Sequence, residues 1–521
     1  MTPRRNFSDN PARITAAAQE SLGYLGEAQF CFPTTRAQQA LWYLDRLEPG
    51  DPAWNIAVRF RLRGQLDVST LERAVNEIVR RHEILRTTFS FMDHAPVQII
   101  HETAFIPLPV DDLSQFSRDA RDSEEERRTI AEGSLPFDLK TGPLLRTSLL
   151  RLAEHDHMLL LTVHHIVSDG WSIGVFSDEL GAHYQDFISQ DFSSASPLPL
   201  QYVDYAVWLK DRDADPALHE HRAYWQRKLA NLPLCEIPTD HPRPQQKTHN
   251  GYILSLLLPV ALTNSLKEFC ASQGCTFFAL TLATLNILIA RYTGQTDIFV
   301  GTLVAGRDHV ELERLIGLFT NTVVLRVDLS GNPLLHHLLS RVRQTLEEAI
   351  AHQDLHFQQV VEALRLKRDP SRPVLYSINF IYQRDFVKPL EFSGLTMTPV
   401  PAKSPGAIHD LNFFMVERAE GWRLSCEFNC DLYDAASVNR MLGQLRVLFE
   451  EIARDPHRRI SEFPFPKNVG EPLPPFAPRT SRPNSQPNLL PANTPETKPR
   501  NPPNHATKKP PTRLQTHFGK N

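Results

Sequence analysis

The sequence contains few cysteines, and none of them stands in a spacing typical of a metal site. Its 521 residues include six, at positions 31, 235, 270, 275, 426 and 430. No C-x-x-C pair occurs among them, so the usual cysteine half of a structural zinc site is missing. We therefore expect reduced thiols, as in a cytoplasmic protein, rather than a disulfide framework.

The chain also lacks an excess of charge of either sign. Lys and Arg number 56 against 60 Asp and Glu, which gives a formal net charge of -4. Binding to nucleic acid or to an anionic membrane usually needs a basic field, so neither partner is expected. Arg4 and Arg5 resemble a twin-arginine export signal, but no continuous apolar segment follows them, and we expect no export.

No apolar run is long enough to predict a membrane span. The most apolar segment, TFFALTLATLNILIARY at 276–292, is short for a span and includes Asn286. Because this segment is apolar nearly all round, it predicts a helix buried in the core of a large domain.

Proline enrichment marks the C-terminal end. Many of the 41 prolines follow residue 467, among Asn, Thr and Lys and with hardly any large apolar residue. Such a segment cannot bury enough surface to offset its conformational entropy, so residues 467–521 are expected to be disordered. Residues 1–28 are expected to form an N-terminal extension.

Between these ends, small and turn-forming residues near 190–200 separate two regions of similar plan. In the first, residues 55–62 alternate as a half-buried strand does, and Ser69 with Glu72 predicts a capping box for the next helix. In the second, residues 252–258 predict an apolar strand, and the apolar residues that follow it are spaced as in a helix. We predict a mixed α/β (α+β) fold with an N-terminal lobe over 29–190 and a C-terminal lobe over 191–466.

The segment HHIVSDGWSIG, residues 164–174, offers two histidines and also a G-x-S-x-G pattern. The apolar residues 158–167 before and around the histidines predict a buried strand. Since neighbouring side chains of a strand point to opposite faces, His164 and His165 cannot both face one cavity. We therefore expect no metal site built on both rings.

Ser172 fits the position of a hydrolase nucleophile, but the surrounding spacing argues against that role. A nucleophile elbow needs the strand to end directly at the first glycine. Here Ser168 and Asp169 stand between the apolar run and Gly170. Ser172 is expected instead in the first turn of a helix.

What remains is a histidine at a strand end, followed by an aspartate and a glycine. A histidine with a pKa near its usual ~6.5 can act as a general base at neutral pH. A buried histidine with a satisfied hydrogen bond would give the same pattern. The residues alone leave both interpretations open.

Seven further segments occur in a fixed order between residues 33 and 464. They are TRAQQALWYL at 35–44, RRHEILRTTF at 80–89, YVDYAVW at 202–208, GTLVAGR at 301–307, IGLFTNTVVLR at 316–326, HQDLHF at 352–357 and RDPSRP at 368–373. Together with HHIVSDG, they closely resemble the motifs of condensation domains of nonribosomal peptide synthetases, in the form that joins an L-residue donor to an L-residue acceptor. The resemblance implies two chloramphenicol-acetyltransferase-like lobes that form a V-shaped pseudo-dimer.

The resemblance also implies roles for the residues of the signature. His165 would position or deprotonate the attacking amine, while His164 would pack on the opposite face. Asp169 would point away from substrate and pair with Arg307, which would fix the loop that carries His165. Gly170 would let backbone approach the thioester.

Other matched residues are expected to support the lobes rather than the chemistry. They are Arg86, Tyr202, Asp204, Trp208, Asn321 and Gln353. Two segments depart from the family pattern. The 368–373 segment lacks the usual Asn after Arg372, and Ile408-His409 replaces a basic and an aromatic residue, which leaves the acceptor specificity open.

By this resemblance the chain is an acyltransferase that forms an amide bond between two carrier-bound substrates in nonribosomal peptide synthesis. No bound cofactor is implied, because the phosphopantetheine arms belong to the donor and acceptor carrier proteins, which we expect to act in trans on a monomer. Delivery to a free amine or alcohol, and a noncatalytic recruiting role, are the alternatives. No adenylation, carrier or thioesterase motif is found, so the chain is either freestanding or a fragment of a synthetase.

Overall fold

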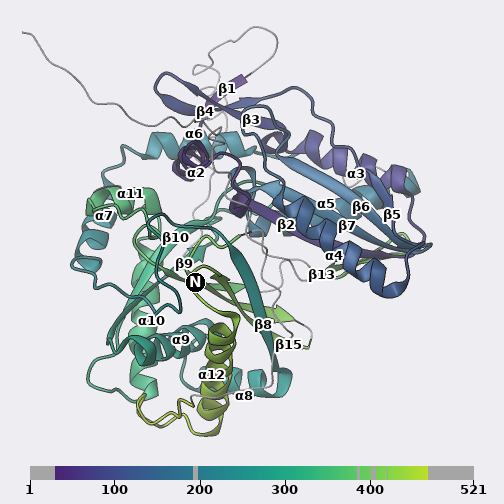
Figure 1. Ribbon diagram of the computed structural model, residues 1–521. Helices are drawn as coiled ribbons and strands as arrows, with labels where there is room; N and C mark the ends of the chain where they lie inside the picture. The colour runs from purple at the N-terminus through teal and green to yellow at the C-terminus, as the bar shows by residue number, and fades with distance from the viewer. Residues whose placement is uncertain (1–29, 192–196, 384–387, 401–405, 419, 467–521) are drawn as a thin grey trace, which may run out of the picture. The chain divides into compact units, whose positions relative to one another are not determined.

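The computed structural model describes residues 30–191, 197–383, 388–400, 406–418 and 420–466 (Figure 1). The expected N-terminal extension, 1–28, and the expected disordered tail, 467–521, lie outside the described residues. The described chain is a mixed α/β structure with two six-stranded sheets and one three-stranded sheet, so the predicted fold class is confirmed. Each of the two larger sheets is built from one half of the sequence, except that one segment of the C-terminal half joins the sheet of the N-terminal half.

The first six-stranded sheet has the order β12-β13-β2-β7-β6-β5. Its strands from the N-terminal half are β2 (Asn55–Arg63), β5 (Val110–Asp112), β6 (Leu145–Ala153) and β7 (Asp156–His164). Helices α3 (Val68–Arg81) and α5 (Gly170–Ser189) pack on one face, and α4 (Arg118–Ser134) contacts β2 and β7 from the other (Figure 1). A smaller sheet, β1-β4-β3, contains β1 (Phe30–Pro33), β3 (Thr87–Met92) and β4 (Ala95–Ile100). Helix α2 (Arg36–Leu47) follows β1.

Helix α3 shows how local chemistry sets the ends of these elements. Asp67, rather than the predicted Ser69, is the N-cap, and its carboxylate accepts a hydrogen bond from the Thr70 amide. A carboxylate at this position is favoured because it accepts a hydrogen bond from a free first-turn N–H and because its negative charge lies at the positive end of the helix dipole. The apolar face of the helix lies in the core, since Leu71 and Val75 are fully buried.

The second six-stranded sheet has the order β10-β9-β11-β14-β15-β8. Its strands are β8 (Gly251–Pro259), β9 (Asp297–Val304), β10 (Asn321–Asp328), β11 (Ile378–Gln383), β14 (Leu411–Arg418) and β15 (Gly421–Asn429). The helices of this half are α6 (Tyr202–Arg212), α7 (Ala217–Lys228), α8 (Val260–Ser272), α9 (Phe277–Thr293), α10 (Leu335–Ala351), α11 (Phe357–Leu364) and α12 (Ala435–Arg454).

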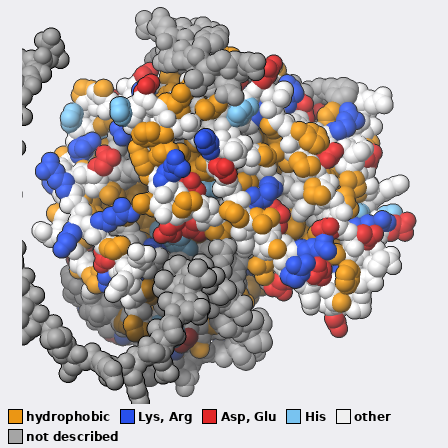
Figure 2. Space-filling view, turned by 45° about the horizontal axis from the view of Figure 1, so that its top comes forward, with side chains coloured by type: hydrophobic (Ala, Val, Ile, Leu, Met, Phe, Trp, Pro, Cys, Tyr) orange, Lys and Arg blue, Asp and Glu red, His pale blue; other side chains and the backbone are white. Residues whose placement is uncertain are grey.

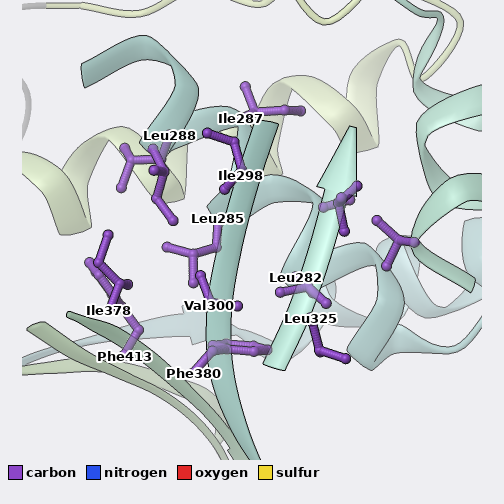
Figure 3. Close-up of a cluster of buried hydrophobic side chains, with 14 of the residues drawn as sticks. Leu282, Leu285, Ile287, Leu288, Ile298, Val300, Leu325, Ile378, Phe380 and Phe413 are labelled. Atoms are coloured by element: carbon purple, nitrogen blue, oxygen red, sulfur yellow. The ribbon is translucent and has the colours of Figure 1, made fainter. Parts of the chain in front are cut away.

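Helix α9 is the predicted core helix, and it packs directly on this sheet. Leu285 lies beside the strand residue Val300, and Leu282 lies beside Leu325 of β10 (Figure 3). Among the described residues, no single helix is long and apolar enough to cross a membrane; α8 and α9 pass that test only as a pair bent by 104°.

One segment from the C-terminal half completes the N-terminal sheet. Strand β13 (Leu395–Val400) pairs antiparallel with β2, with Met397 opposite Leu62, and β12 (Leu390–Phe392) pairs with β13. Phe392 also packs edge-on against Tyr184 of α5. Both strands lie inside the range 191–466 expected for the C-terminal lobe, yet they belong to the sheet of the N-terminal half. The division of the sequence into two lobes therefore does not match the division of the strands between the two sheets. The lobe boundary near residue 190 stays a prediction.

The surface carries mixed charge, in keeping with the balanced composition. Figure 2 shows blue and red side chains interspersed with hydrophobic ones across the visible face. This face offers no broad field of one sign.

The exchanged strand provides a first test. Met397 is 1% exposed within the core of the N-terminal sheet, so Met397→Ala should lower the free energy of unfolding by about 2–5 kcal/mol. Thr398→Ala, the next residue on the opposite face, should cost less than about 1 kcal/mol. Urea unfolding of both variants measures the difference. Equal, small effects would show that β13 is not part of the folded core in solution.

Candidate active site

His164 is the last residue of β7, and its ring is a packing group. It pairs with Asn55 of β2 and is 4% exposed. The Ile166 amide donates a hydrogen bond to its Nδ1 at 3.1 Å, and the ring meets Phe137 edge-on. Burial, aided by the neighbouring His165, lowers the pKa of His164 to about 3. His164 is therefore neutral and already hydrogen-bonded at physiological pH.

His165 begins the 3-10 turn that follows the strand, so its ring leaves the sheet register. Its buried Nδ1 has no hydrogen-bond partner among the described residues. Burial lowers the pKa of His165, an effect that nearby backbone groups and Asp169 partly oppose. The ring therefore carries a lone pair at neutral pH, which a proton-accepting group requires.

Asp169 is fully buried and is the N-cap of α5. Its Oδ2 accepts from Arg307 Nη1 at 2.7 Å and from the Phe319 amide at 3.1 Å. Its Oδ1 accepts from the Ser172 amide at 2.9 Å and from Ser172 Oγ at 2.7 Å. Burial alone would raise the pKa of Asp169, but the charge and hydrogen bonds of Arg307 and Ser172 lower it overall. The carboxylate thus stays ionised and faces the protein interior.

Arg307 is the partner expected for Asp169, and its side chain is 1% exposed. Its other donors bind the backbone carbonyls of Leu312 and Leu315, each at 3.2 Å. Its guanidinium also lies 4.1 Å from the ring centroid of Phe319. The pair therefore ties the first turn of α5 to the loop that joins β9 and β10.

Ser172 belongs to this structural network. It lies in the first turn of α5, as predicted, and is 1% exposed. Its Oγ is 3.0 Å from the Gly317 carbonyl and accepts from the Gly317 amide and from Arg307 Nη2, each at 3.1 Å. A hydroxyl bound to a carboxylate, a guanidinium and backbone, with no histidine among these partners, is not arranged as a nucleophile.

Gly170 is exposed, and because it has no side chain, the backbone beside this network stays accessible. A Cβ at this position would lie 3.3 Å from Nε2 of Gln383, the last residue of β11. A side chain would therefore narrow the space between α5 and β11. Gln383 was not singled out from the sequence.

The residues expected to be supporting are hydrogen-bonded or packed, and none of the contacts described here for them involves His165. Tyr202 donates to the Leu318 carbonyl at 2.8 Å, and Asn321 donates to the Gln353 carbonyl at 2.9 Å. Other members of the set act as follows: Arg86 donates to the His101 carbonyl, Asp204 accepts from the Gln201 amide at the start of α6, and Trp208 stacks on Tyr205.

The two segments that differ from the family pattern are also held by contacts within the protein. Arg372 donates to Glu236 at 2.7 Å and to Asp369 at 2.6 Å, which holds the 368–373 loop. His409 stacks on Tyr376 with centroids 5.0 Å apart. Burial, together with the charges of Lys247 and His249, lowers the pKa of His409 to about 3.

Gln38 holds the turn that carries His165 from the other side, and sequence reasoning missed it as well. Its Nε2 donates to the Ile166 carbonyl at 3.2 Å and to Gln98 at 3.1 Å. The T-R-A-Q segment contained the available signal, because Thr35 and Gln38 form a capping box at the start of α2.

One group in the described ranges has the ligand spacing of a metal site, and it does not include the two signature histidines. It consists of Glu48, Asp51 and His249. His249 Nδ1 contacts Asp51, and its Nε2 lies 2.9 Å from Lys247 Nζ. A lysine on one ring nitrogen and a carboxylate on the other form an ordinary ionic network.

Two helix-covered six-stranded sheets, with a histidine directly after the end of β7, give the described chain an acetyltransferase-like fold. The chain belongs to the condensation domain family, whose model matches residues 28–469.

Similar curated proteins are long synthetases. A linear gramicidin synthase protein from Brevibacillus parabrevis is 39% identical over 435 residues, which cover 83% of this chain and 6% of that protein. Chondramide synthase cmdD from Chondromyces crocatus is 40% identical over 430 residues, which cover 82% and 11%. The chain thus spans a small part of the length of these relatives.

Solved structures agree on the fold. The X-domain from teicoplanin biosynthesis is 28% identical, with a TM-score of 0.75, over 85% of this chain and 99% of that one. The same X-domain is also known in a complex with OxyB. The first condensation domain of the CDA synthetase, at 20% identity and a TM-score of 0.70 over 83% of this chain and 98% of that one, shows the fold alone.

The buried ion pair makes a second prediction. Removing one partner strands the other charge, so Asp169→Ala and Arg307→Ala should each cost roughly 3–5 kcal/mol. The double variant should cost clearly less than the sum, because neither charge is then unpaired. Thermal and urea unfolding of the four proteins complete the cycle. An additive result would contradict the pairing.

The buried neutral histidines make a third prediction. His164 and His409 remain unprotonated in the folded protein from about pH 6.5 down to about pH 3, whereas the unfolded chain binds protons below about 6.5. The free energy of unfolding should therefore fall as the pH falls through this window. His409→Phe keeps an aromatic face on Tyr376 and should reduce the slope by at most about 1.4 kcal/mol per pH unit.

Urea unfolding at pH 7.5 and 5.5 measures that slope. His155→Gln, at a largely exposed position, is the matched control. If the His409→Phe slope equals that of the unaltered chain, His409 is not buried in its neutral form.

Proposed function

We propose that the chain forms an amide bond between a donor acyl or aminoacyl group and an amino-acid acceptor, each held as a thioester on a carrier protein. The observation that supports this most strongly is His165. Its ring is neutral, its Nδ1 is free of partners among the described residues, and it stands on a turn held by the Asp169–Arg307 pair. The relatives include linear gramicidin synthase, chondramide synthase and a phosphinothricin tripeptide synthetase, which supports this proposal.

In the proposed mechanism, His165 accepts a proton from the acceptor amine as the amine nitrogen attacks the thioester carbonyl carbon. The C–S bond then breaks, the thiol of the donor phosphopantetheine arm leaves with the proton, and the amide remains on the acceptor. No covalent bond to the protein is needed. Most of the acceleration comes from holding two tethered reactants together.

The other roles follow the same proposal. Asp169 and Arg307 position the turn, His164 packs it from the strand side, and the absent side chain of Gly170 admits the thioester. The carriers act in trans on a monomer of this chain in the cytoplasm, with no cofactor of its own. Arg86, Tyr202, Trp208 and Asn321 support the lobes.

A recruiting role is the second candidate, and a specific observation favours it. The X-domain, which shares this fold at 28% identity, forms a complex with another protein, OxyB. A pure docking module has no need for a neutral histidine at the end of a strand, so substitution of that residue separates the two functions.

The proposal predicts different effects for the two histidines. His165→Ala should slow amide formation by roughly 10²-fold or more, because it removes the proton acceptor, and should leave the melting temperature nearly unchanged. His164→Ala should instead lower the melting temperature, because it removes a buried, hydrogen-bonded ring.

The assay pairs carrier domains loaded with a panel of proteinogenic aminoacyl groups, and mass spectrometry detects dipeptidyl products on the acceptor. Efficient product from a soluble amine without an acceptor carrier would favour the free-amine alternative. No product from any pair, together with retained carrier binding, would favour recruitment. An active His165→Ala and a stable, inactive His164→Ala would reverse the assignment.

A further inference from the structure

Strand β11 places alternate side chains on opposite faces of the C-terminal sheet. Phe380 and Tyr382 point into the helix-covered core: Phe380 lies beside α9 (Figure 3), and Tyr382 stacks on Trp422 with centroids 4.8 Å apart. Because side chains alternate along a strand, Ile381 and Gln383 must point away from that core. Gln383 is thus directed to the side of the sheet where α5 begins.

The side-chain amide of Gln383 lies at the candidate active site. The distance of 3.3 Å from its Nε2 to a Cβ built on Gly170 places the amide beside open backbone, one residue after the buried Asp169. Gln383 is partly exposed, and its amide makes no hydrogen bond with any described residue. A donor group therefore lies beside Gly170, five residues after His165.

Other amides near this sheet behave differently. Asn379, on the same strand and the same face, donates to Asn412 Oδ1 at 3.0 Å. Asn321 bridges two backbone segments, donating to the Gln353 carbonyl and accepting from the Phe357 amide. These two amides serve structure and have partners within the protein. The Gln383 amide has a donor available for a bound molecule.

We propose that Gln383 is a catalytic residue whose Nε2–H donates a hydrogen bond to the carbonyl oxygen of the donor thioester. This inference rests on the proposed function and adds the group that stabilises developing negative charge. Because Gly170 has no side chain, the thioester can come within reach of the Gln383 amide. One role then explains both the glycine at position 170 and the Gln383 amide that has no partner among the described residues.

The step balances with groups already named. The amine nitrogen bonds to the carbonyl carbon, the carbonyl π electrons move to the oxygen, and Gln383 stabilises that oxyanion. His165 holds the amine proton. When the oxyanion collapses, the C–S bond breaks and the thiolate sulfur takes the proton from His165. Glutamine is neither protonated nor consumed.

The test uses the full chain with the aminoacyl-carrier pair that the unaltered protein turns over fastest. Gln383→Ala should lower kcat about 10²–10³-fold, as loss of one oxyanion donor does, while KM for either loaded carrier changes less than about threefold. Gln383→Glu keeps the length of the side chain but loses the donor, and should lose kcat at least as strongly at pH 7.5. Gln115→Ala, on an exposed loop, is the matched control.

The outcomes separate this inference from the proposed function. If both Gln383 variants keep kcat within about threefold while His165→Ala is inactive, the function stands and the role of Gln383 is wrong. A raised KM with unchanged kcat would equally overturn it, since Gln383 would then only line the entrance. If Gln383→Ala fails to fold, a folded Gln383→Glu decides by its kcat. If the unaltered chain forms no product with any pair, both proposals fail.

Discussion

The buried ion pair between Asp169 and Arg307 is the constraint on which the arrangement of the site depends. Two charges withdrawn from water are tolerated only when each is fully matched, and here the carboxylate accepts hydrogen bonds from Arg307, Ser172 and Phe319. A network satisfied this completely has one low-energy geometry. The start of α5 and the β9–β10 loop are consequently fixed with respect to each other, and the short turn before α5 has little freedom.

This rigidity accounts for the contrast between the two adjacent histidines. His164 completes its hydrogen bonding within the strand end, whereas His165 keeps a buried nitrogen with no partner among the residues that the structure describes. An unsatisfied buried polar atom costs stability, and His165 is one of several described residues that carry such an atom. The ion pair of Asp169, four residues further on, fixes the start of α5 directly after the turn on which His165 stands.

The sequence predicted some of this and could not predict the rest. The strand expected through residues 158–167 ends at His164, and His165 stands on the 3-10 turn that follows, so the two rings are separated by the end of the strand and not by strand alternation. The spacing before Gly170 removed Ser172 from consideration as a nucleophile. The partner of Asp169 lies 138 residues away, and only the resemblance to a family indicated it. The roles of Ser172 and Gln383 depend on how separate segments meet in space, which local periodicity does not record. The predicted capping position of α3 was wrong because Asp67 competes better for the free amides.

The exchange of β12 and β13 has a consequence for how such chains can be recombined. Thr398 and Arg61, which touch across β13 and β2, are 337 residues apart, so no single cut in the sequence separates the two sheets. A chimera joined near residue 195 would pair β2 of one parent with β13 of the other. Its success would depend on whether the side chains on those two strands fit one another, and building new synthetases from halves would need residues 390–400 to travel with the N-terminal half.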